Sequence, residues 1–456
     1  MRTYYAGAPA QDLDRRGEDV LAARAQRHRE LAQHRERGEV LITTLDEGSR
    51  TVVLIVADDV PYLVSTLNAR IAGDWGGARL VVHPILRATR DDDGELRSVD
   101  ELEDVRAISS GDTQTIPIVG ALGETSAAES WIQVELAENL DESQAQELIE
   151  GLRPALRTVA QIDADHDDMV RWVGSVNDSL SPMRSQLDDV EPAQEFLTWL
   201  LDGRFVLMGV KEYDLREDDE GLYLSSVKGS GLGILAETEE KSGRPRRLTV
   251  QAAEHARDRQ AMFVTKANTR SGLHRNDYLD YIGVRRFDAD GQVDGEYLIL
   301  GLFARKAYST SARNTPWVRD KVRAVAESFG FRPDSHSERD LQSVLEEYPR
   351  DELLHMSVEE AVRAARGVVE LDERRVTACS AARTSSGASS RPSSTCRAIA
   401  TTPRSASGSR RSSPRPTARW TSTSTSRCRP PRWPGSSSGC ACRRTPRRRW
   451  ITRTCS

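Results

Sequence analysis

Cysteine is absent from the first 375 residues of this 456-residue chain. A zinc site needs a recognisable cysteine and histidine spacing, yet the closest later pair, at 440 and 442, is separated by one residue and has no histidine nearby. These positions therefore predict neither a disulfide framework nor a metal centre. The complete set is Cys379, Cys396, Cys428, Cys440, Cys442 and Cys455.

Long apolar runs are also missing. A membrane-spanning helix requires a stretch of about 18 apolar residues, and none occurs. The opening residues, MRTYYAGAPAQDLDRRGED, contain no apolar core of a signal peptide. We therefore expect a cytoplasmic protein that binds no membrane.

Residues 376–456 contain no acidic residue and no lysine, but they contain 17 arginines. Of the 64 basic side chains in the chain, 47 therefore lie in residues 1–375, together with all 70 acidic ones. The formal charge is −23 for this body and +17 for the tail. Because so acidic a body repels a phosphate backbone and the tail arginines are not interleaved with lysines, we expect no nucleic-acid binding.

Aromatic residues form only 5% of the chain and hydrophobic residues 38%, which is low for a globular protein of this length. The tail accounts for part of this deficit, because it also lacks Leu, Phe, Tyr, Asn, Gln, His and Met. A segment of this composition cannot bury a core, so we expect residues 376–456 to be disordered.

The clearest pattern in the chain is a strand pair at residues 281–287 and 296–303. Both runs are rich in β-branched and aromatic residues, and the residues between them, DADGQVDG, favour a turn. A polar, mostly basic segment precedes this hairpin. It contains four potential cations that could hold a small anion: Lys266, Arg270, His274 and Arg275.

Earlier in the chain, strand and helix signals alternate. Residues 40–44, 51–56, 79–85 and 131–136 are typical of strands, whereas helical periodicity begins near residue 61 and again at 141–160. The order β-α-β-β-α suits a ferredoxin-like α/β sandwich. Residues 10–37 favour a charged surface or interface helix.

Several sequence words, in order and at matching spacing, resemble one family. They are VADDVPYLVSTLNARI, EFLTWLLDGRFVLMGVKEYDL, GSGLGIL, TKANTRSGLHR, YLDYIGVRRFD, GLFARKAYS and DSHSERDLQSVLEEYPRDELLHMSVEEA. Over residues 15–375 the chain resembles the N-terminal regulatory half of the large bacterial NAD-specific glutamate dehydrogenases. The resemblance implies ACT-type amino-acid-binding domains, an oligomeric enzyme, and a catalytic domain that lies well beyond the matching segment.

The resemblance also points to an effector site. In ACT domains an effector sits where the first strand turns into the first helix, here at residues 57–61. Helix-start amides favour a carboxylate, and Asp58 and Asp59 could take an ammonium group. The simpler interpretation is that one of these aspartates caps the helix. For the basic loop the simpler interpretation is pairing with acidic neighbours such as Asp277 and Asp280, or with another subunit.

The tail composition has a specific interpretation. After an ERRV segment the resembling family continues with a strand. GC-rich codons for DEFGRFVSALVYL, read one base late, give TSSGASSRPSSTC, which is the sequence of residues 384–396. We therefore interpret the chain after about Val376 as the product of a frameshift.

The remaining motifs predict no chemistry. Residues 163–168, DADHDD, lack the glycine and distal glutamate of a calcium loop and are typical of a helix-starting linker. The glycines at 229–233 lack the third glycine of a dinucleotide loop, and no GxSxG marks a hydrolase. We expect no catalytic, cofactor-binding or metal-binding residue in this chain. NAD would serve the intact family member, and the competing interpretation is a stand-alone ACT-type amino-acid sensor.

The predicted fold class is α/β (α+β), with tandem ACT-like, ferredoxin-like sandwiches joined by helical connectors. The predicted segments are an N-terminal helical segment 1–39, a first ACT-like domain 40–162, a linker 163–190, a second ACT-like domain 191–310, a helical connector 311–375 and the tail 376–456. A capping box at Ser357 and Glu360 introduces the last predicted helix of the connector.

Overall fold

The computed structural model describes residues 4–101, 126–237, 245–332, 334–369, 378–383, 394–400 and 419–421. The chain forms two compact units, of which the first is discontinuous. It comprises Met1–Met169, Leu232–Ala236 and Thr269–Tyr278, and the remaining residues form the second unit. Helices and strands form two large antiparallel sheets with covering helices and one small three-stranded sheet, which confirms the predicted mixed fold class.

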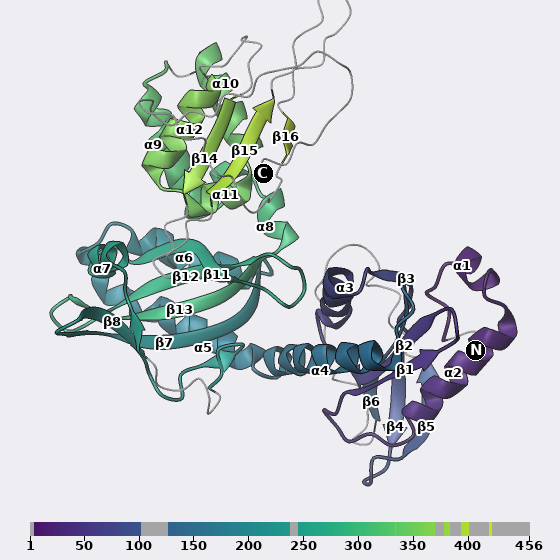
Figure 1. Cartoon of the computed structure of the whole chain (residues 1–456). Coiled ribbons are helices and arrows are strands. Elements are labelled where there is room, and N and C mark those ends of the chain that lie inside the picture. The colour runs from purple at the N-terminus through teal and green to yellow at the C-terminus, as the bar shows by residue number, and fades with distance from the viewer. Residues whose placement is uncertain are drawn as a thin grey trace, which may run out of the picture. The chain divides into compact units, whose positions relative to one another are not determined.

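The first unit is a sheet between two helical layers (Figure 1). The strands follow the order β1-β2-β6-β4-β5, and β3 also pairs with β6. Its elements are α1 Ala10–Asp14, α2 Glu18–Leu31, β1 Leu41–Asp46, β2 Thr51–Asp58, α3 Leu63–Asp74, β3 Ala78–Val82, β4 Ile85–Arg90, β5 Leu96–Glu101, β6 Ser126–Leu136, α4 Glu142–Ala164 and the two-residue β9 Leu232–Gly233.

Two separate apolar cores hold these layers together, because residues of a strand alternate between its faces. Ile55 of β2 and Ile132 of β6 face α3 and α4, where Leu67 and Leu148 complete one core. Val56 and Trp131 face the other way, toward Leu21 of α2. Nearly every residue of β2 is buried because its alternate side chains pack into the two cores on opposite faces of the sheet.

The predicted element order is confirmed for this unit, with three local differences. The helix expected from Pro61 begins at Leu63. The expected strand 79–85 is two strands, β3 and β4, interrupted at His83 and Pro84, and β5 was not predicted. The N-terminal helix is divided at Gly17, whose φ of 82° lies in the left-handed region that glycine tolerates.

The second unit contains an antiparallel sheet in the order β10-β8-β7-β13-β12-β11. The predicted hairpin is confirmed: β12 pairs with β13, and Asp288 and Gly291 form the turn. Its elements are α5 His166–Ser179, which starts in the first unit, the 3₁₀ turn Ser181–Ser185, α6 Val190–Leu201, β7 Phe205–Asp218, β8 Gly221–Ser226, β10 Arg246–Arg247, α7 Val250–Ala256, β11 Met262–Arg270, β12 Tyr278–Phe287 and β13 Val293–Phe303.

Aromatic contacts join two helices to this sheet. Trp172 of α5 meets Tyr297 of β13 with ring centroids 5.6 Å apart, and Phe196 of α6 meets Phe303 at 6.3 Å. Tyr297 and Phe303 point to the same face of the sheet, because side chains alternate along a strand and an even number of positions separates the two residues. The domain boundaries 163–190 and 191–310 remain predictions.

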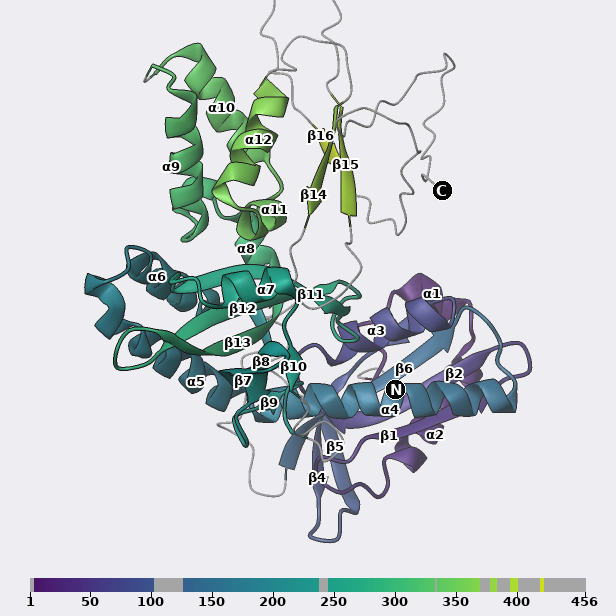
Figure 2. The same cartoon turned by 60° about the vertical axis from the view of Figure 1, so that its left-hand side comes forward.

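A helical group follows the sheet, and α9, α10 and α12 lie together in both views (Figures 1 and 2). The predicted capping box is confirmed, since the Ser357 and Glu360 side chains each accept the other's backbone N–H. The elements are α8 Arg305–Ser309, the 3₁₀ turn Ala312–Asn314, α9 Val318–Phe329, α10 His336–Glu347, α11 Arg350–His355 and α12 Val358–Val369.

Most of the arginine-rich tail lies outside the described residues. The expectation that the tail is disordered concerns mainly these residues. The described parts form three short antiparallel strands in the order β14-β15-β16, with bounds Ala378–Arg383, Ser394–Ala400 and Arg419–Thr421. Among the described residues, no helix is long and apolar enough to cross a membrane.

Candidate functional site

The junction between β2 and α3 is the predicted effector position in the first unit. The backbone of Tyr62 adopts φ 67° and ψ 2°, a left-handed conformation that ends the extended segment and lets α3 start at Leu63. No side chain caps this helix. The prediction that Asp58 or Asp59 caps it is therefore wrong, because the turn at Tyr62 moves the helix start beyond their reach.

Asp58 instead belongs to a buried charge network on the neighbouring strand. Arg35, with its side chain 2% exposed, contacts Asp58 at 2.7 Å and Glu129 at 2.9 Å. Arg90 contacts the same Glu129 at 2.8 Å. Burial alone would raise the pKa of Glu129, but the two arginines outweigh burial and lower it. Asp58 is thus held in an ion pair by a buried arginine.

Asp59 accepts a hydrogen bond of 2.6 Å from the Ser130 hydroxyl, whose oxygen lies 2.8 Å from Nε2 of His83. A carboxylate can only accept, so the hydroxyl proton points to Asp59 and His83 must donate to Ser130. A serine nucleophile needs the opposite order, with the hydroxyl donating to histidine. Ser130 and His83 therefore position Asp59, and the three residues do not form a hydrolase site.

A further carboxylate lies near this junction. Burial raises the pKa of Asp163, at the end of α4, and the negative charges of Asp59 and Asp58 raise it further against the opposing effect of His166. Asp163 can respond in this way only if the three carboxylates lie close enough to interact. The carboxylates of Asp163, Asp59 and Asp58 therefore lie within electrostatic range of one another.

The loop Thr269–Tyr278 covers the start of α3 within the same unit. The backbone N–H of His274 donates to Thr66 Oγ1 at 2.9 Å, and its Nδ1 lies 2.9 Å from Ser65 Oγ. The His274 ring meets the Tyr62 ring edge-on, with centroids 4.9 Å apart. Burial lowers the pKa of His274, and the Arg275 charge lowers it further, so the ring is neutral near pH 7.

The predicted basic loop therefore meets the start of α3, directly after the predicted effector position at residues 57–61. His274, like Tyr62, has a left-handed backbone, with φ 60°. Arg70 of α3 adds a hydrogen bond of 3.1 Å from Nε to the Gly272 carbonyl. Strained backbone held by packed neighbours is common where ligands bind.

The other predicted cations are placed differently. Lys266 belongs to the second unit, where its Nζ lies 2.6 Å from Asp280 and 3.1 Å from Asp351. Arg275 lies 3.7 Å from Asp277. The alternative interpretation, pairing with Asp277 and Asp280, is thus confirmed for these two cations. The Arg270 guanidinium stacks on the Tyr278 ring at 4.6 Å and donates to the Asn276 carbonyl.

Lys266 also occupies the one group of potential metal ligands among the described residues, Asp280, Asp351 and His355. Asp280 is fully buried and accepts from His355 Nε2 at 2.8 Å and from the Phe303 backbone N–H at 3.0 Å. The Lys266 ammonium group already contacts both carboxylates, so the geometry supports a structural ion cluster. The linker at 163–168 forms no comparable group, and α5 begins there at His166, as expected.

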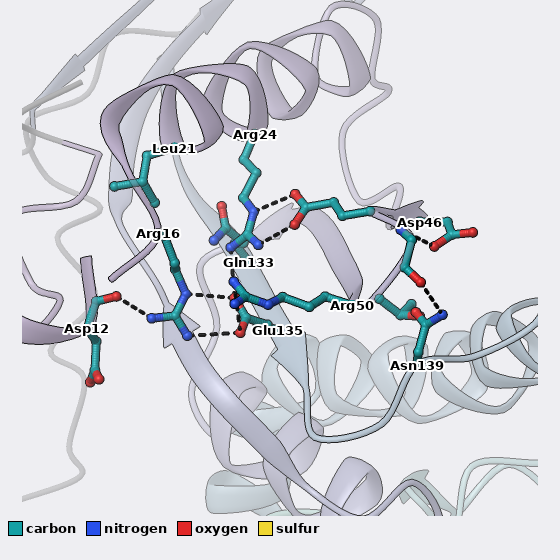
Figure 3. A network of polar contacts seen from close by, with 12 residues as sticks. Asp12, Arg16, Leu21, Arg24, Asp46, Arg50, Gln133, Glu135 and Asn139 are labelled. Carbon is teal, nitrogen blue, oxygen red and sulfur yellow. Dashed lines mark hydrogen bonds and ion pairs between the residues drawn. The ribbon is translucent and has the colours of Figure 1, made fainter. Parts of the chain in front are cut away.

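Sequence reasoning missed the polar face of β6 beneath α2 (Figure 3). Glu135, 1% exposed, accepts hydrogen bonds from Arg16 at 2.7 Å and Arg24 at 3.0 Å. Gln133 of the same face accepts from the Tyr5 hydroxyl at 3.2 Å. The signal was present, because residues 129, 133 and 135 are polar at even spacing inside a strand. The N-terminal helices therefore pack on the sheet of the first unit.

His28 completes this buried network. Its Nε2 lies 3.0 Å from the Ile55 carbonyl, which can only accept, so Nε2 carries the proton and Nδ1 accepts from the Tyr4 hydroxyl at 2.6 Å. Burial lowers the pKa of His28 to about 4, and the bond to Ile55 opposes this only in part. The ring is therefore neutral in the folded protein.

The glycines at 229–233 do not cradle a phosphate in the described structure. The Gly233 N–H donates to Asp165 at 2.8 Å, and a backbone turn follows at Leu235. A dinucleotide loop needs those amides free at the start of a helix.

Comparison with known proteins agrees with the resemblance. Residues 1–152 match the family model described as glutamate dehydrogenase, ACT1 domain, and residues 315–374 match glutamate dehydrogenase, helical motif 1. The NAD-specific glutamate dehydrogenase of Halomonas elongata is 29% identical over 82% of this chain and 23% of its own length. Those of Pseudomonas aeruginosa and Mycobacterium tuberculosis are 24% and 25% identical over 72% and 76% of this chain.

The chain spans 23%, 19% and 20% of the length of these three relatives. The matches agree with the family that the sequence words predicted, and the first and last of those words lie within the two matched regions. We conclude that this chain is similar to the N-terminal region of the NAD-specific glutamate dehydrogenases.

Proposed function

We propose that this chain is a regulatory and oligomerisation region of an NAD-specific glutamate dehydrogenase. The intact cytoplasmic enzyme would oxidise L-glutamate with NAD and water to 2-oxoglutarate, ammonium and NADH, in glutamate catabolism. The match of residues 1–152 to the ACT1 domain supports this proposal, and the matches cover 23%, 19% and 20% of the length of the three relatives. The hydride transfer would take place on residues outside this chain.

The regulatory ligand would be an amino acid bound at the β2–α3 junction. Its carboxylate would approach the uncapped amides at the start of α3, where the helix dipole favours an anion. Its ammonium group would face the carboxylates of Asp59 and Asp163, which lie within electrostatic range of each other. His274, held on Ser65 and Thr66, would close the site.

Ligand binding could affect the rest of the chain through the loop Thr269–Tyr278. Thr269–Tyr278 is part of the first unit, but it connects β11 directly to β12. A ligand that moved His274 or Arg275 would therefore pull on the ends of two strands. Regulation would follow from a different affinity of the ligand for the two loop positions.

A thermal-shift screen of the common amino acids on the full chain tests this site. A ligand at one hundred times its dissociation constant should stabilise the first unit by about 2.7 kcal/mol. The variants Asp59→Asn and His274→Ala should weaken the shift. His34→Ala, at an exposed histidine of the same unit, is the matched control. If no amino acid shifts the transition, or all three variants respond like the wild type, effector binding at this junction is wrong.

The frameshift interpretation of the tail can be tested on the gene. We propose that the reading frame changes near residue 376. Restoring the frame by one base should extend the open frame into glutamate-binding and NAD-binding domains, and the resulting protein should form NADH from L-glutamate and NAD. The 456-residue chain, assayed in parallel, should not. A corrected frame that stops within a few codons would refute the frameshift. Turnover by the purified chain itself would refute the proposal that hydride transfer takes place on residues outside this chain.

A further inference from the structure

Four charged side chains join the sheet of the second unit to the helical group. They are Lys266, Asp280, Asp351 and His355, called the ion cluster below. β11 and β12 supply the first two residues, and α11 supplies the other two. The Lys266 Nζ lies 3.1 Å from Asp351, and the His355 Nε2 lies 2.8 Å from Asp280. Two charged contacts therefore link α11 to the sheet.

The cluster is balanced in charge and shielded from water. Nδ1 of His355 faces the backbone carbonyl of Asp351, and Nε2 faces the Asp280 carboxylate. Asp280 acts as an acceptor, because the Lys266 ammonium at 2.6 Å and the Phe303 N–H at 3.0 Å also donate to it. Both ring nitrogens therefore donate, and the ring carries a positive charge. The Asp280 side chain is 0% exposed and that of His355 is 7% exposed, so a displacement of about 1 Å would break contacts that water does not replace.

The helical group is a module distinct from the sheet. Its helices α9, α10 and α12 pack together, and their buried residues include Val325, Leu341 and Ala365. The match to glutamate dehydrogenase, helical motif 1 covers residues 315–374, and therefore all of α9 to α12, whereas the sheet lies outside it. The ion cluster thus connects two parts of the second unit that differ in architecture and in sequence family model.

The two sheet residues of the cluster lie at the base of the loop that covers α3. Lys266 precedes the loop Thr269–Tyr278 by three residues on β11, and Asp280 follows it by two residues on β12. The loop is closed across its own base, because the Ser271 N–H donates to the Asp277 carbonyl at 2.7 Å. A closed loop moves as one piece, so its displacement would reach both strands beside the cluster.

We propose that the ion cluster is a regulatory switch that couples the loop Thr269–Tyr278 to the helical group. While His274 is held on Thr66, the strands keep Lys266 and Asp280 in place for α11. An effector that displaces the loop moves these two residues, and α11 is then held less firmly on the sheet. The regulatory use of this coupling rests on the proposed amino-acid site, whereas the coupling itself belongs to the chain without a ligand. Coupling is reciprocal, so loosening α11 must loosen the loop by the same factor.

Hydrogen exchange of the full chain without any amino acid, read by mass spectrometry on loop and α11 peptides, tests this coupling. Thr66→Val removes the acceptor of the His274 N–H. Exchange in α11 should then become about fivefold faster or more, as expected for coupled sites. Thr51→Val is the matched control, because it removes the acceptor of the Leu140 N–H at 2.8 Å in the same unit, and it should leave α11 unchanged.

The reciprocal variant changes the cluster and reads the loop. His355→Gln removes the charged contact with Asp280 and should speed exchange in the loop by the same factor. Ser335→Ala, which removes the cap of α10 and leaves the cluster intact, is its control. With the cluster already broken, adding Thr66→Val should hardly change α11 further. The double variant should therefore exchange in α11 more slowly than the product of the two single effects.

Equal exchange of α11 in Thr66→Val and Thr51→Val would overturn the proposal, as would single effects that simply multiply in the double variant. If Thr66→Val does not fold, Arg70→Met takes its place, because it removes the hydrogen bond to the Gly272 carbonyl. A chain that shows the coupling but binds no amino acid would support the switch and refute the effector site. A chain that binds an amino acid at the β2–α3 junction without the coupling would refute the switch alone.

Discussion

The substitution Glu135→Gln removes one negative charge from the buried network beneath α2 (Figure 3). The wild-type carboxylate is 1% exposed and binds Arg16 and Arg24, whose side chains are 8% and 1% exposed. Glutamine keeps the volume, but its amide N–H group would face guanidinium donors, and the buried positive charge would lose its partner. Breaking a buried pair on one side costs about 3–5 kcal/mol. Arg24 retains Glu47 at 2.6 Å, so we expect the lower end of this range.

Hydrogen exchange in increasing urea, read by mass spectrometry on β6 and α2 peptides, measures this loss in the first unit alone. Glu30→Gln is the control, because its pair with Arg27 on α2 is exposed by 50% and 67% and should be worth less than about 1 kcal/mol. A loss from Glu135→Gln no larger than that of the control would refute the argument that this network holds α2 on the sheet.

The same experiment has a pH dependence. Burial alone would raise the pKa of Glu135, but the hydrogen bonds from Arg16 and Arg24 outweigh it, and the pKa is lowered. A carboxylate with a depressed folded pKa contributes stability that is complete above its unfolded pKa and is lost as the pH falls through the folded value. The difference between wild type and Glu135→Gln should therefore shrink in acid.

Three further predictions follow from single contacts. The pKa of His28 is about 4 when folded against 6.5 unfolded, so the first unit should lose about 3 kcal/mol between pH 7 and pH 4, and His28→Gln should flatten this slope in pH-dependent exchange. Asp280→Asn should lower the urea midpoint of the second unit far more than Asp219→Asn, because Lys266 and His355 lose a fully buried partner. Burial lowers the pKa of Lys321 to about 7, so stability should rise between pH 7 and pH 10, and Lys321→Met should remove that rise in urea melts.

Local patterns predicted the elements whose causes are local. The hairpin of β12 and β13 follows from alternating apolar residues and a turn sequence, and the last long helix follows from the capping box at Ser357. The start of α3 was misplaced because Pro61 normally opens a helix, whereas the left-handed turn at Tyr62 delays it by two residues. Short elements with weak periodicity, β5 and α11, were missed.

The candidate site depends on contacts that no local pattern contains. His274 reaches Thr66 across 208 residues, and nothing in either segment specifies the other. The burial of the arginines was not predicted for another reason. Pattern analysis assigns core positions to apolar residues. Arg24 and His28 occupy such positions in α2 beside Leu21. Arg24 finds a polar partner in Glu135 of β6, and His28 finds its partners in Tyr4 and in the Ile55 carbonyl of β2.

The discontinuity of the first unit has a consequence for synthesis. Its main part ends at Met169, whereas the loop that covers α3 ends at Tyr278. At 5–20 residues per second, a ribosome needs roughly 5 to 20 s to make the intervening segment. During that interval Thr66, which is fully buried in the finished unit, has no His274 to accept from. A fragment cut at residue 152, where the ACT1 match ends, would remain in that uncovered state permanently.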